Sequence, residues 1–182
     1  IARLNEGAIT WACDQHAAQT SQAFVFQRPV MLRRSVLENL IYPLRIRGVS
    51  RSEARDRAER WAQRAGLGSM LDRPATFLSG GEQQKLALTR ALIMDPQLVF
   101  LDEPSASLDG RATREIENIL ADTQKTGTRL ILSTHDMGQA RRLADRVIFM
   151  LGGRVHETGP AAPFFEHPQT PEANAFLNGD IV

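Results

Sequence analysis

Apolar residues along this chain follow two alternating patterns. Short continuous apolar runs occur at 98–101, 130–132 and 147–150, and such runs are typical of strands buried on both faces of a parallel sheet. Between them, 111–122 and 136–143 carry apolar residues at helical spacing. Strands that alternate with helices imply right-handed crossover connections. The pattern therefore predicts an α/β fold with a parallel sheet flanked by helices.

The first part of the chain predicts two more strands and two more helices. The stretches 7–11 and 22–27 are rich in β-favouring residues and predict strands. Apolar residues at helical spacing over 35–44 predict a helix that Pro43 ends, and the charged segment from Ser50 to Ala65 predicts an amphipathic helix. Acidic and basic residues alternate along that helix, so a solvated face is expected there rather than a nucleic-acid patch.

Both ends of the chain give weaker patterns. Residues 1–4 read as the end of a helix whose beginning is missing, so we expect a fragment truncated at its N-terminus. Gly152-Gly153 predicts a hairpin turn, and the proline-rich tail predicts loops with one short helix near Phe164.

Composition narrows the function classes. The chain has 182 residues, 42% of them hydrophobic, which suits one soluble globular domain. Lys+Arg 22 against Asp+Glu 21 gives a net charge of +1, so no overall positive field attracts nucleic acid. The single cysteine, Cys13, is interpreted as a small buried hydrophobe in a reducing compartment. Charged residues interrupt every apolar block before the roughly 18 residues that a membrane helix needs.

Polar residues follow three of the predicted strands. Gln27, the pair Asp102-Glu103, and Ser133-Thr134-His135-Asp136 each close an apolar run. Open α/β sheets bind ligands beyond the carboxyl ends of their strands, so these side chains are expected along one rim.

Each polar group suggests a chemical role and also has a simpler explanation. Asp102 is a candidate Mg²⁺ partner, directly or through water, because that cation prefers oxygen ligands. Glu103 is a candidate general base that polarises a water for attack on phosphorus. His135 could hydrogen-bond a transferring phosphoryl group or hold the attacking water. Taken singly, Asp-Glu-Pro also fits a turn, and His135 and Gln27 also fit ordinary strand-end residues.

A diglycine follows Ser79 at the start of another predicted helix. Ser79-Gly80-Gly81-Glu82 fits the S-x-x-E capping pattern, which explains a well-capped helix without any ligand. Capping does not require two glycines, which weaken a first turn. Close approach of a phosphate to free backbone N–H groups does favour them. A phosphate contact at Ser79, Gly80, Gly81 and Glu82 is therefore the sharper hypothesis.

These motifs resemble those of the nucleotide-binding subunits of ABC transporters. Leu78 to Gln83 resembles the ABC signature, Leu98 to Glu103 the Walker B strand, and Ser105 to Asp109 the D-loop. Gln27 resembles the Q-loop glutamine and His135 the switch histidine. The five motifs stand in the family order and cover most of the chain.

The resemblance implies a P-loop NTPase-like ABC ATPase fold and a set of site residues. Residues 1–182 would be a partial ABC ATPase domain, with a helical subdomain over about 35–78 and the signature helix, Walker B strand and catalytic core over 79–182. Glu103, His135 and Gln27 would be catalytic, Asp102 and Gln27 would contact Mg²⁺, and Asp109 would join the signature residues in contacting ATP.

The resemblance also implies partners and a location. Two ATPase subunits would form a homodimer around two ATP molecules, with the signature helix of one facing the phosphate loop of the other. The stretch from Gln27 to about Arg47 would touch transmembrane permease subunits, and a solute-binding protein would take part indirectly. The chain would then lie in the cytoplasm, peripheral on the inner face of the cell membrane, without binding nucleic acid.

One departure from the family pattern is large. No G-x-x-x-x-G-K-[ST] loop occurs in the sequence, so this Walker A motif and the adenine-stacking aromatic residue would precede Ile1. We therefore expect these 182 residues alone to bind ATP poorly, to hydrolyse it negligibly, and to be less soluble than the full-length protein.

Three functions are compatible with these motifs. The first is an ATPase subunit of a bacterial importer of small solutes, with compactness and the tail resembling the oxyanion type that transports phosphate or tungstate. The second is a soluble ABC-type ATPase that acts on nucleic acid or ribosomes, although neither long heptads nor tandem cassettes are present. The third is an inactive truncated product, supported only by the missing loop.

Overall fold

The computed structural model describes residues 6–180, and these divide into two compact units with the boundary between Ser133 and Thr134. The proposed end of a helix at residues 1–4 lies outside the described residues. None of the helices formed by the described residues has both the length and the apolarity to cross a membrane.

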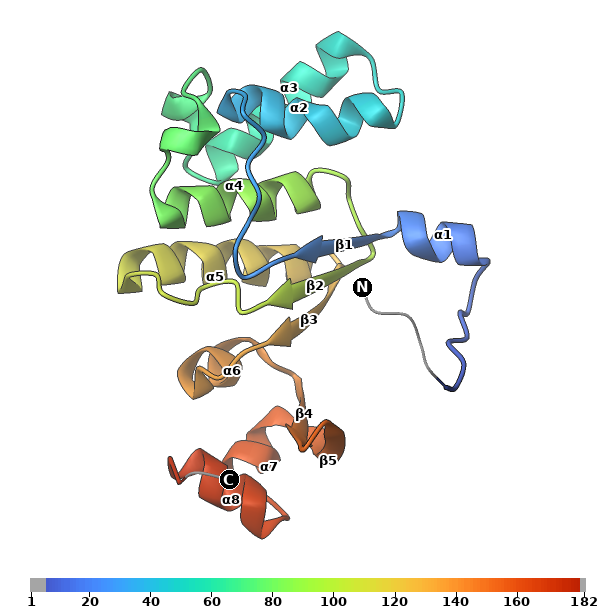
Figure 1. Ribbon diagram of the computed structural model, residues 1–182, viewed down its shortest axis with the longest axis vertical. Coiled ribbons are helices and arrows are strands. Elements are labelled where there is room, and N and C mark those ends of the chain that lie inside the picture. Colours follow the sequence, from blue (N-terminus) through green and yellow to red (C-terminus); the bar gives the residue numbers. More distant parts are fainter. Residues whose placement is uncertain (1–5, 181–182) are drawn as a thin grey trace. The chain divides into compact units, whose positions relative to one another are not determined.

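A parallel sheet organises the first unit. Strands β1 (Gln22–Val25), β2 (Leu98–Asp102) and β3 (Arg129–Ser133) pair in the order β1-β2-β3, with both pairings parallel. Helices α4 (Gly80–Leu92) and α5 (Gly110–Lys125) lie on one face of this sheet (Figure 1). The three strands were predicted at these places, and the α/β fold with a parallel sheet is confirmed.

Helices α2 (Val36–Ile46) and α3 (Arg51–Arg64) lie beyond α4 in Figure 1, joined to it by two 3-10 turns, η1 (Gly68–Met70) and η2 (Ala75–Phe77). The predicted apolar face of α3 packs inward, because Ala54, Ala58 and Ala62 are buried. Together with Leu40 and other apolar residues of α2 and α4, they form one core cluster. The segment 35–78, expected as a helical subdomain, lies wholly within the first unit.

Several expectations for the first unit were wrong. Cys13, interpreted as a buried residue, is exposed. Residues 7–11 form no strand, and a short helix α1 (Gln15–Thr20) precedes β1 instead. Pro43 lies inside α2 rather than ending it, so the helix continues to Ile46. Strand β2 is not buried on both faces: Val99 and Leu101 are buried, whereas Leu98 and Phe100 on the other side are half-buried. The described helices of this unit cover mainly one face of the sheet, which explains that alternation.

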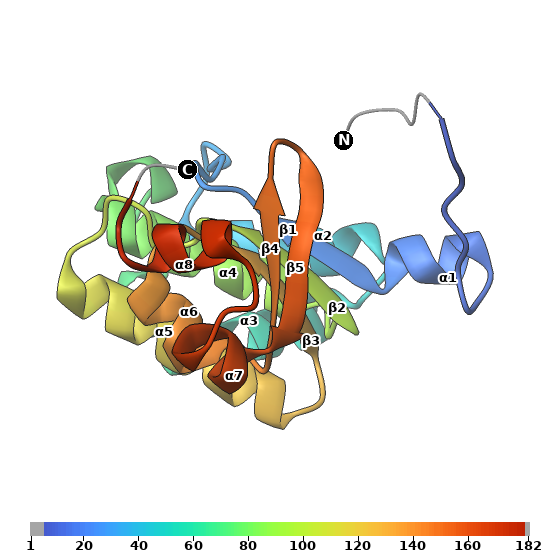
Figure 2. The ribbon, with the colours of Figure 1, turned by 90° about the horizontal axis from the view of Figure 1, so that it is seen from below.

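The second unit contains an antiparallel hairpin and three helices. Strands β4 (Arg146–Leu151) and β5 (Arg154–Pro160) lie side by side in Figure 2, and helices α6 (Met137–Leu143), α7 (Ala161–Glu166) and α8 (Pro171–Leu177) complete it. Phe149, Phe164 and Phe165 belong to its core. The hairpin at Gly152-Gly153 is confirmed, and both glycines have positive φ. The prediction that 147–150 joins the parallel sheet was wrong, because this strand pairs with β5. Helix α8 was not predicted from the sequence.

Candidate functional site

The carboxyl ends of the three parallel strands bring polar side chains together. Asp102, the last residue of β2, is in register with Ser133, the last residue of β3. Gln27 follows β1, whose Val25 is in register with Leu101. Since neighbouring parallel strands end at the same edge, these residues share one rim, as predicted.

Hydrogen bonds tie this rim together. Gln27 Nε2 donates to Glu103 Oε2 at 3.1 Å, and Ser133 Oγ donates to Asp102 Oδ1 at 2.7 Å. The backbone N–H of Glu103 donates to the carbonyl of Ser133 at 3.0 Å. The structure therefore brings together Gln27, Asp102 and Glu103, which the sequence placed on one rim. Ser133, noted only as a strand-end residue, is the partner that orients Asp102.

Glu103 has an uncommon backbone conformation. Its φ is 43°, in the left-handed region that non-glycine residues seldom occupy. Such conformations cost on the order of 1–3 kcal/mol and cluster at functional sites. The backbone turns sharply at Glu103, directly after the strand, and the carboxylate is thereby presented next to Gln27.

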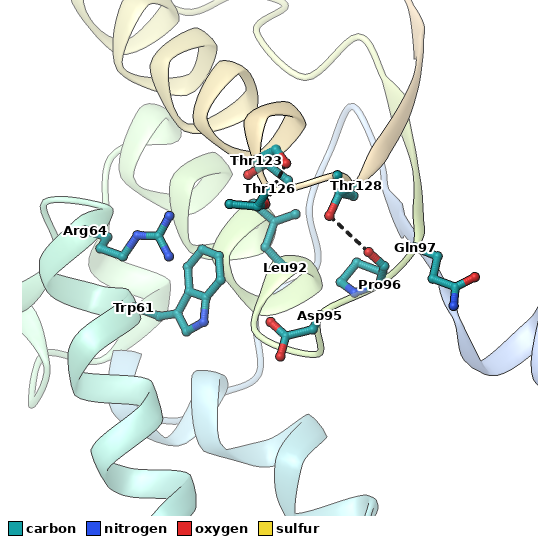
Figure 3. Close-up of a pocket in the computed structure, with 10 residues that line it drawn as sticks. Trp61, Arg64, Leu92, Asp95, Pro96, Gln97, Thr123, Thr126 and Thr128 are labelled. Atoms are coloured by element: carbon teal, nitrogen blue, oxygen red, sulfur yellow. Dashed lines mark hydrogen bonds between the residues drawn. The ribbon is translucent and has the colours of Figure 1, made fainter.

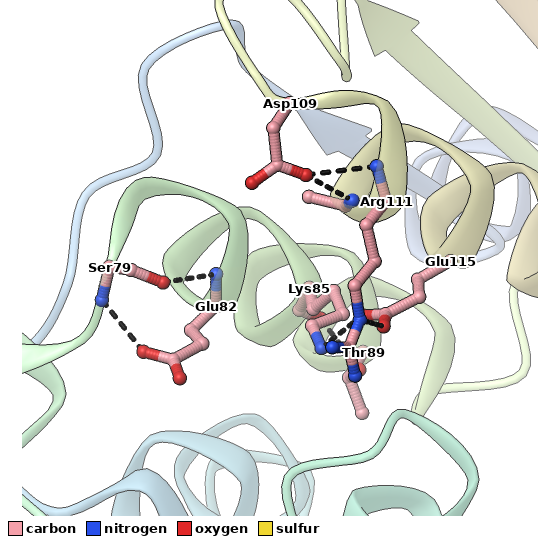
Figure 4. A network of polar contacts seen from close by, with 8 residues as sticks. Ser79, Glu82, Lys85, Thr89, Asp109, Arg111 and Glu115 are labelled. Carbon is pink, nitrogen blue, oxygen red and sulfur yellow. Dashed lines mark hydrogen bonds and ion pairs between the residues drawn. The ribbon is translucent and has the colours of Figure 1, made fainter.

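The signature segment begins helix α4 with a complete capping box (Figure 4). Ser79 Oγ accepts from Glu82 N at 3.4 Å, and Glu82 Oε2 accepts from Ser79 N at 2.7 Å. The hydrogen bond from the Ser79 backbone, with smaller contributions from the Ser79 side chain and nearby cations, holds the pKa of Glu82 below its ordinary value despite partial burial. The N–H groups of Gly80 and Gly81 lie in the first turn, where the helix supplies no acceptor, so this end of α4 suits an anion.

The two glycines have different surroundings. A Cβ on Gly81 would lie 2.8 Å from Ala112 Cβ on α5, which is too close for any real contact. A Cβ on Gly80 would lie 3.8 Å from Leu108 Cδ2, which is an ordinary contact. Helix packing therefore explains why position 81 is a glycine, and the sequence alone did not reveal this reason. No such steric reason exists at Gly80, where close approach of a ligand remains the explanation for a glycine.

Asp109 begins helix α5. Its Oδ1 accepts from the N–H groups of Arg111 at 2.9 Å and Ala112 at 2.8 Å (Figure 4). This is an N-cap role, and the predicted contact of Asp109 with ATP stays a prediction.

A buried lysine joins α4 to α5. Lys85 Nζ contacts Glu115 Oε2 at 2.7 Å, and Glu115 Oε1 accepts from Arg111 Nε at 3.0 Å (Figure 4). The hydrogen bond from Lys85, followed by that from Arg111, lowers the pKa of Glu115. Sequence reasoning missed this network, although Arg111 and Glu115 stand four residues apart on one helix, a spacing that brings side chains together.

His135 belongs to the second unit and lies between β3 and α6. The adjacent Asp136 caps α6, since its Oδ1 accepts from Gln139 N at 2.9 Å. The role assigned to His135 remains a prediction.

A shallow cavity of about 380 Å³ lies elsewhere in the first unit (Figure 3). Gln97 directly precedes β2 and Thr128 directly precedes β3, so the cavity opens at the amino ends of the strands, opposite the rim. Its hydroxyls already donate to backbone carbonyls, as in the bond of 3.1 Å from Thr128 Oγ1 to Pro96 O. Its lining residues are Trp61, Arg64, Leu92, Asp95, Pro96, Gln97, Thr123, Thr126, Gly127 and Thr128. The rim chemistry is therefore separate from this cavity.

The rim offers few metal ligands. Among the described residues, no group of three or more His, Cys, Asp or Glu side chains could hold a metal ion. Two carboxylates and a carboxamide nevertheless fit Mg²⁺, which keeps several waters and is usually bound through one or two carboxylates together with substrate phosphates.

Comparison with known proteins gives a consistent result. Residues 2–106 match the ABC transporter family. The chain is 38% identical over 135 residues to the glutamate transport ATP-binding protein GluA of Corynebacterium efficiens, covering 74% of this chain and 56% of that protein. It is 37% identical over 154 residues to the tungstate uptake system ATP-binding protein TupC of Peptoclostridium acidaminophilum, covering 84% and 72%.

A solved structure extends the comparison to the fold. The structure of cbiO1 from Clostridium perfringens, part of the ABC transporter complex cbiONQ, superposes with a TM-score of 0.74 at 29% identity, covering 82% of this chain and 61% of that one. A phosphate import ATP-binding protein, PstB 2 of Natronomonas pharaonis, is 37% identical over 175 residues, covering 91% of this chain and 62% of that protein. The chain thus spans between 56% and 72% of the length of the three curated relatives.

Proposed function

Because this chain belongs to the ABC transporter family, we propose that it is part of an ATP-binding and ATP-hydrolysing subunit that powers a transporter. The observation that carries this proposal is the hydrogen bond of 3.1 Å between Gln27 Nε2 and Glu103 Oε2, beside the Ser133–Asp102 bond of 2.7 Å. This observation supports the proposal because Glu103, Gln27 and Asp102, the residues proposed as base, orienting carboxamide and metal ligand, lie on one rim.

Each rim residue has a proposed role. Asp102, oriented by Ser133, would hold Mg²⁺ directly or through water, where the cation would offset phosphate charge. Glu103 would orient and polarise the attacking water, while Gln27 holds the Glu103 carboxylate and would be a second contact for the metal. His135 stabilises the transferring phosphoryl group.

The start of α4 acts on a second subunit. We expect Ser79, Gly80, Gly81 and Glu82, with Asp109, to face the ATP held by the phosphate loop of the partner in a homodimer. Backbone N–H groups and the positive end of the helix dipole favour such an anion. Since the 182 residues contain no phosphate-loop motif, we expect them to bind ATP weakly when isolated.

The proposed transport role is inferred from the transport roles named for the related proteins. The named relatives are called proteins of glutamate transport, tungstate uptake and phosphate import. We therefore propose import of a small solute, with an oxyanion as the first candidate. The subunit would bind transmembrane permease subunits and lie peripherally on the cytoplasmic face of the membrane. A solute-binding protein would contact it only through the permease.

The decisive test uses the full-length protein with Glu103→Gln. The amide still accepts the Gln27 hydrogen bond but cannot act as a base, so Mg-ATP binding should persist while the rate of hydrolysis falls by roughly 10²- to 10⁴-fold. Glu59→Gln, at the exposed Arg55–Glu59 pair on α3, is the matched control and should retain wild-type hydrolysis. Full hydrolysis by Glu103→Gln would contradict the assignment of the base.

A further inference from the structure

Lys85 is a lysine in the interior of the first unit. Its side chain is only 10% exposed, on the signature helix α4. Lysines are almost never buried without a partner, because an unpaired ammonium loses its hydration. Here Nζ lies 2.7 Å from Glu115 Oε2 on α5. It also lies 3.8 Å from the position that a Cβ on Gly66 would take, just after α3 ends. Lys85 therefore occupies the place where three helices meet.

Glu115 uses both carboxylate oxygens. Oε2 accepts from Lys85, and Oε1 accepts from Arg111 Nε at 3.0 Å. The Arg111 side chain is 87% exposed, so this second ion pair is screened by water and contributes little to stability. The Lys85–Glu115 pair, in which Lys85 is 10% exposed and Glu115 is 36% exposed, is better shielded from water and joins α4 to α5 directly.

A second contact lies one helical turn away. Gly81 precedes Lys85 by four residues and so shares its helix face. Across the interface, a Cβ on Gly81 would lie 2.8 Å from Ala112 Cβ, three residues before Glu115. Two separate contacts on the same pair of helices restrain their rotation as well as their separation.

We propose that Lys85 and Glu115 are positioning residues that, with the Gly81–Ala112 contact, hold the start of the signature helix at a fixed place relative to the Asp109 loop. This inference rests on the proposed function, in which both segments face the ATP of a partner subunit. The ion pair touches no nucleotide and acts through the orientation of α4. Its loss should therefore weaken steps that need the dimer and leave nucleotide binding by one subunit intact.

The test uses Lys85→Met in the full-length protein, since methionine keeps the length and apolar stem of lysine. A misplacement of the order of 1 Å lowers rates by up to about 100-fold, so we expect kcat for ATP hydrolysis to fall about 10- to 100-fold. The ATP affinity of the dilute monomer should change less than about twofold on the same argument. Arg55→Met, which breaks the exposed Arg55–Glu59 pair on α3, should leave both quantities unchanged.

A purely structural role gives a different result. In that case kcat per folded molecule stays at the wild-type value and only the folded fraction, measured by circular dichroism, declines. Lys85→Arg, which keeps the charge, should recover most of kcat, and the reversed pair Lys85→Glu with Glu115→Lys should recover more than either single change. If Lys85→Met fails to fold, Glu115→Gln provides the same comparison, because it keeps an acceptor for Lys85 without the charge.

The failures are distinguishable. A wild-type protein that hydrolyses no ATP overturns the proposed function and this inference with it. A wild-type protein that hydrolyses ATP, together with Lys85→Met and Glu115→Gln variants that hydrolyse it equally well, overturns this inference alone.

Discussion

Gln27 and Glu103 are joined by a hydrogen bond across the ends of β1 and β2, with 3.1 Å between Gln27 Nε2 and Glu103 Oε2. The two residues are 76 positions apart in the sequence, and only the parallel pairing of the strands brings them together. Because the carboxamide donates to the carboxylate, it restrains the rotamer of a residue whose backbone already has φ of 43°. Gln27 is thus placed to orient Glu103, as the third group of a catalytic triad orients its general base.

The first prediction concerns this bond. Gln27→Leu keeps the side-chain size but removes the donor, so the full-length protein should hydrolyse ATP more slowly by about five- to tenfold, as expected for one hydrogen bond of about 1 kcal/mol. Its thermal stability should hardly change, because Gln27 is exposed and Glu103 is only half-buried. Steady-state kinetics with a melting curve checks both quantities. A large loss of stability with unchanged kcat would instead show that Gln27 stabilises the fold and has no part in catalysis.

The second prediction separates the two signature glycines. Gly81→Ala forces a methyl group into the space of Ala112 and should destabilise the protein by about 1–3 kcal/mol, as overpacking does. Gly80→Ala has room for its methyl and should stay within about 1 kcal/mol of wild type. Urea unfolding of both variants makes the comparison. The double variant Gly81→Ala with Ala112→Gly should regain most of the loss, and simple additivity of the two changes would contradict the contact.

Local patterns were sufficient to predict much of the first unit and one helix of the second. The strands near 22–27, 98–101 and 130–132 and the helices near 51–65, 111–122 and 136–143 follow from periodicity within a few residues. The rim containing Gln27, Asp102 and Glu103 followed from strand ends in a parallel sheet. In each case the deciding signal lies within one element or at its end.

The features that were missed depend on residues far apart. The apolar run at 147–150 resembles a buried parallel strand, but β5 is its partner, and no local pattern distinguishes these pairings. The stretch 7–11 has β-favouring residues, yet no described strand pairs with it. Lys85 and Glu115 are 30 residues apart, and the steric reason for Gly81 appears only once α5 is placed beside α4.

The third prediction is a pH dependence of stability. The pKa of Glu115 is lowered from its ordinary value of 4.5, chiefly by the hydrogen bond from Lys85. A carboxylate with a depressed folded-state pKa contributes stability above its unfolded pKa and loses it as pH falls through the folded value. Glu115→Gln should therefore be less stable than wild type at pH 7, and the difference should shrink as the pH falls below about 4.5.

Urea midpoints measured between pH 7 and pH 3 provide the check. Glu59→Gln is the control, since the exposed ion pair with Arg55 should contribute little at any pH. A difference between wild type and Glu115→Gln that stays constant over the whole pH range would show that the charge of Glu115 contributes nothing.

The last prediction concerns the turn between α4 and β2. Asp95 has φ of 48°, pairs with Arg57 on α3, and precedes Pro96, which disfavours the helical conformation for the residue before it. Asn tolerates the left-handed region, so Asp95→Asn loses only an exposed ion pair, worth at most about 1 kcal/mol. Asp95→Val adds a β-branched side chain at the same φ and should cost about 1–3 kcal/mol more. Asp95→Gly should be at least as stable as Asp95→Asn, because glycine adopts positive φ freely.

Thermal unfolding of the three variants tests this order of stability. A valine variant as stable as the asparagine variant would mean that this turn relaxes to another conformation at no cost.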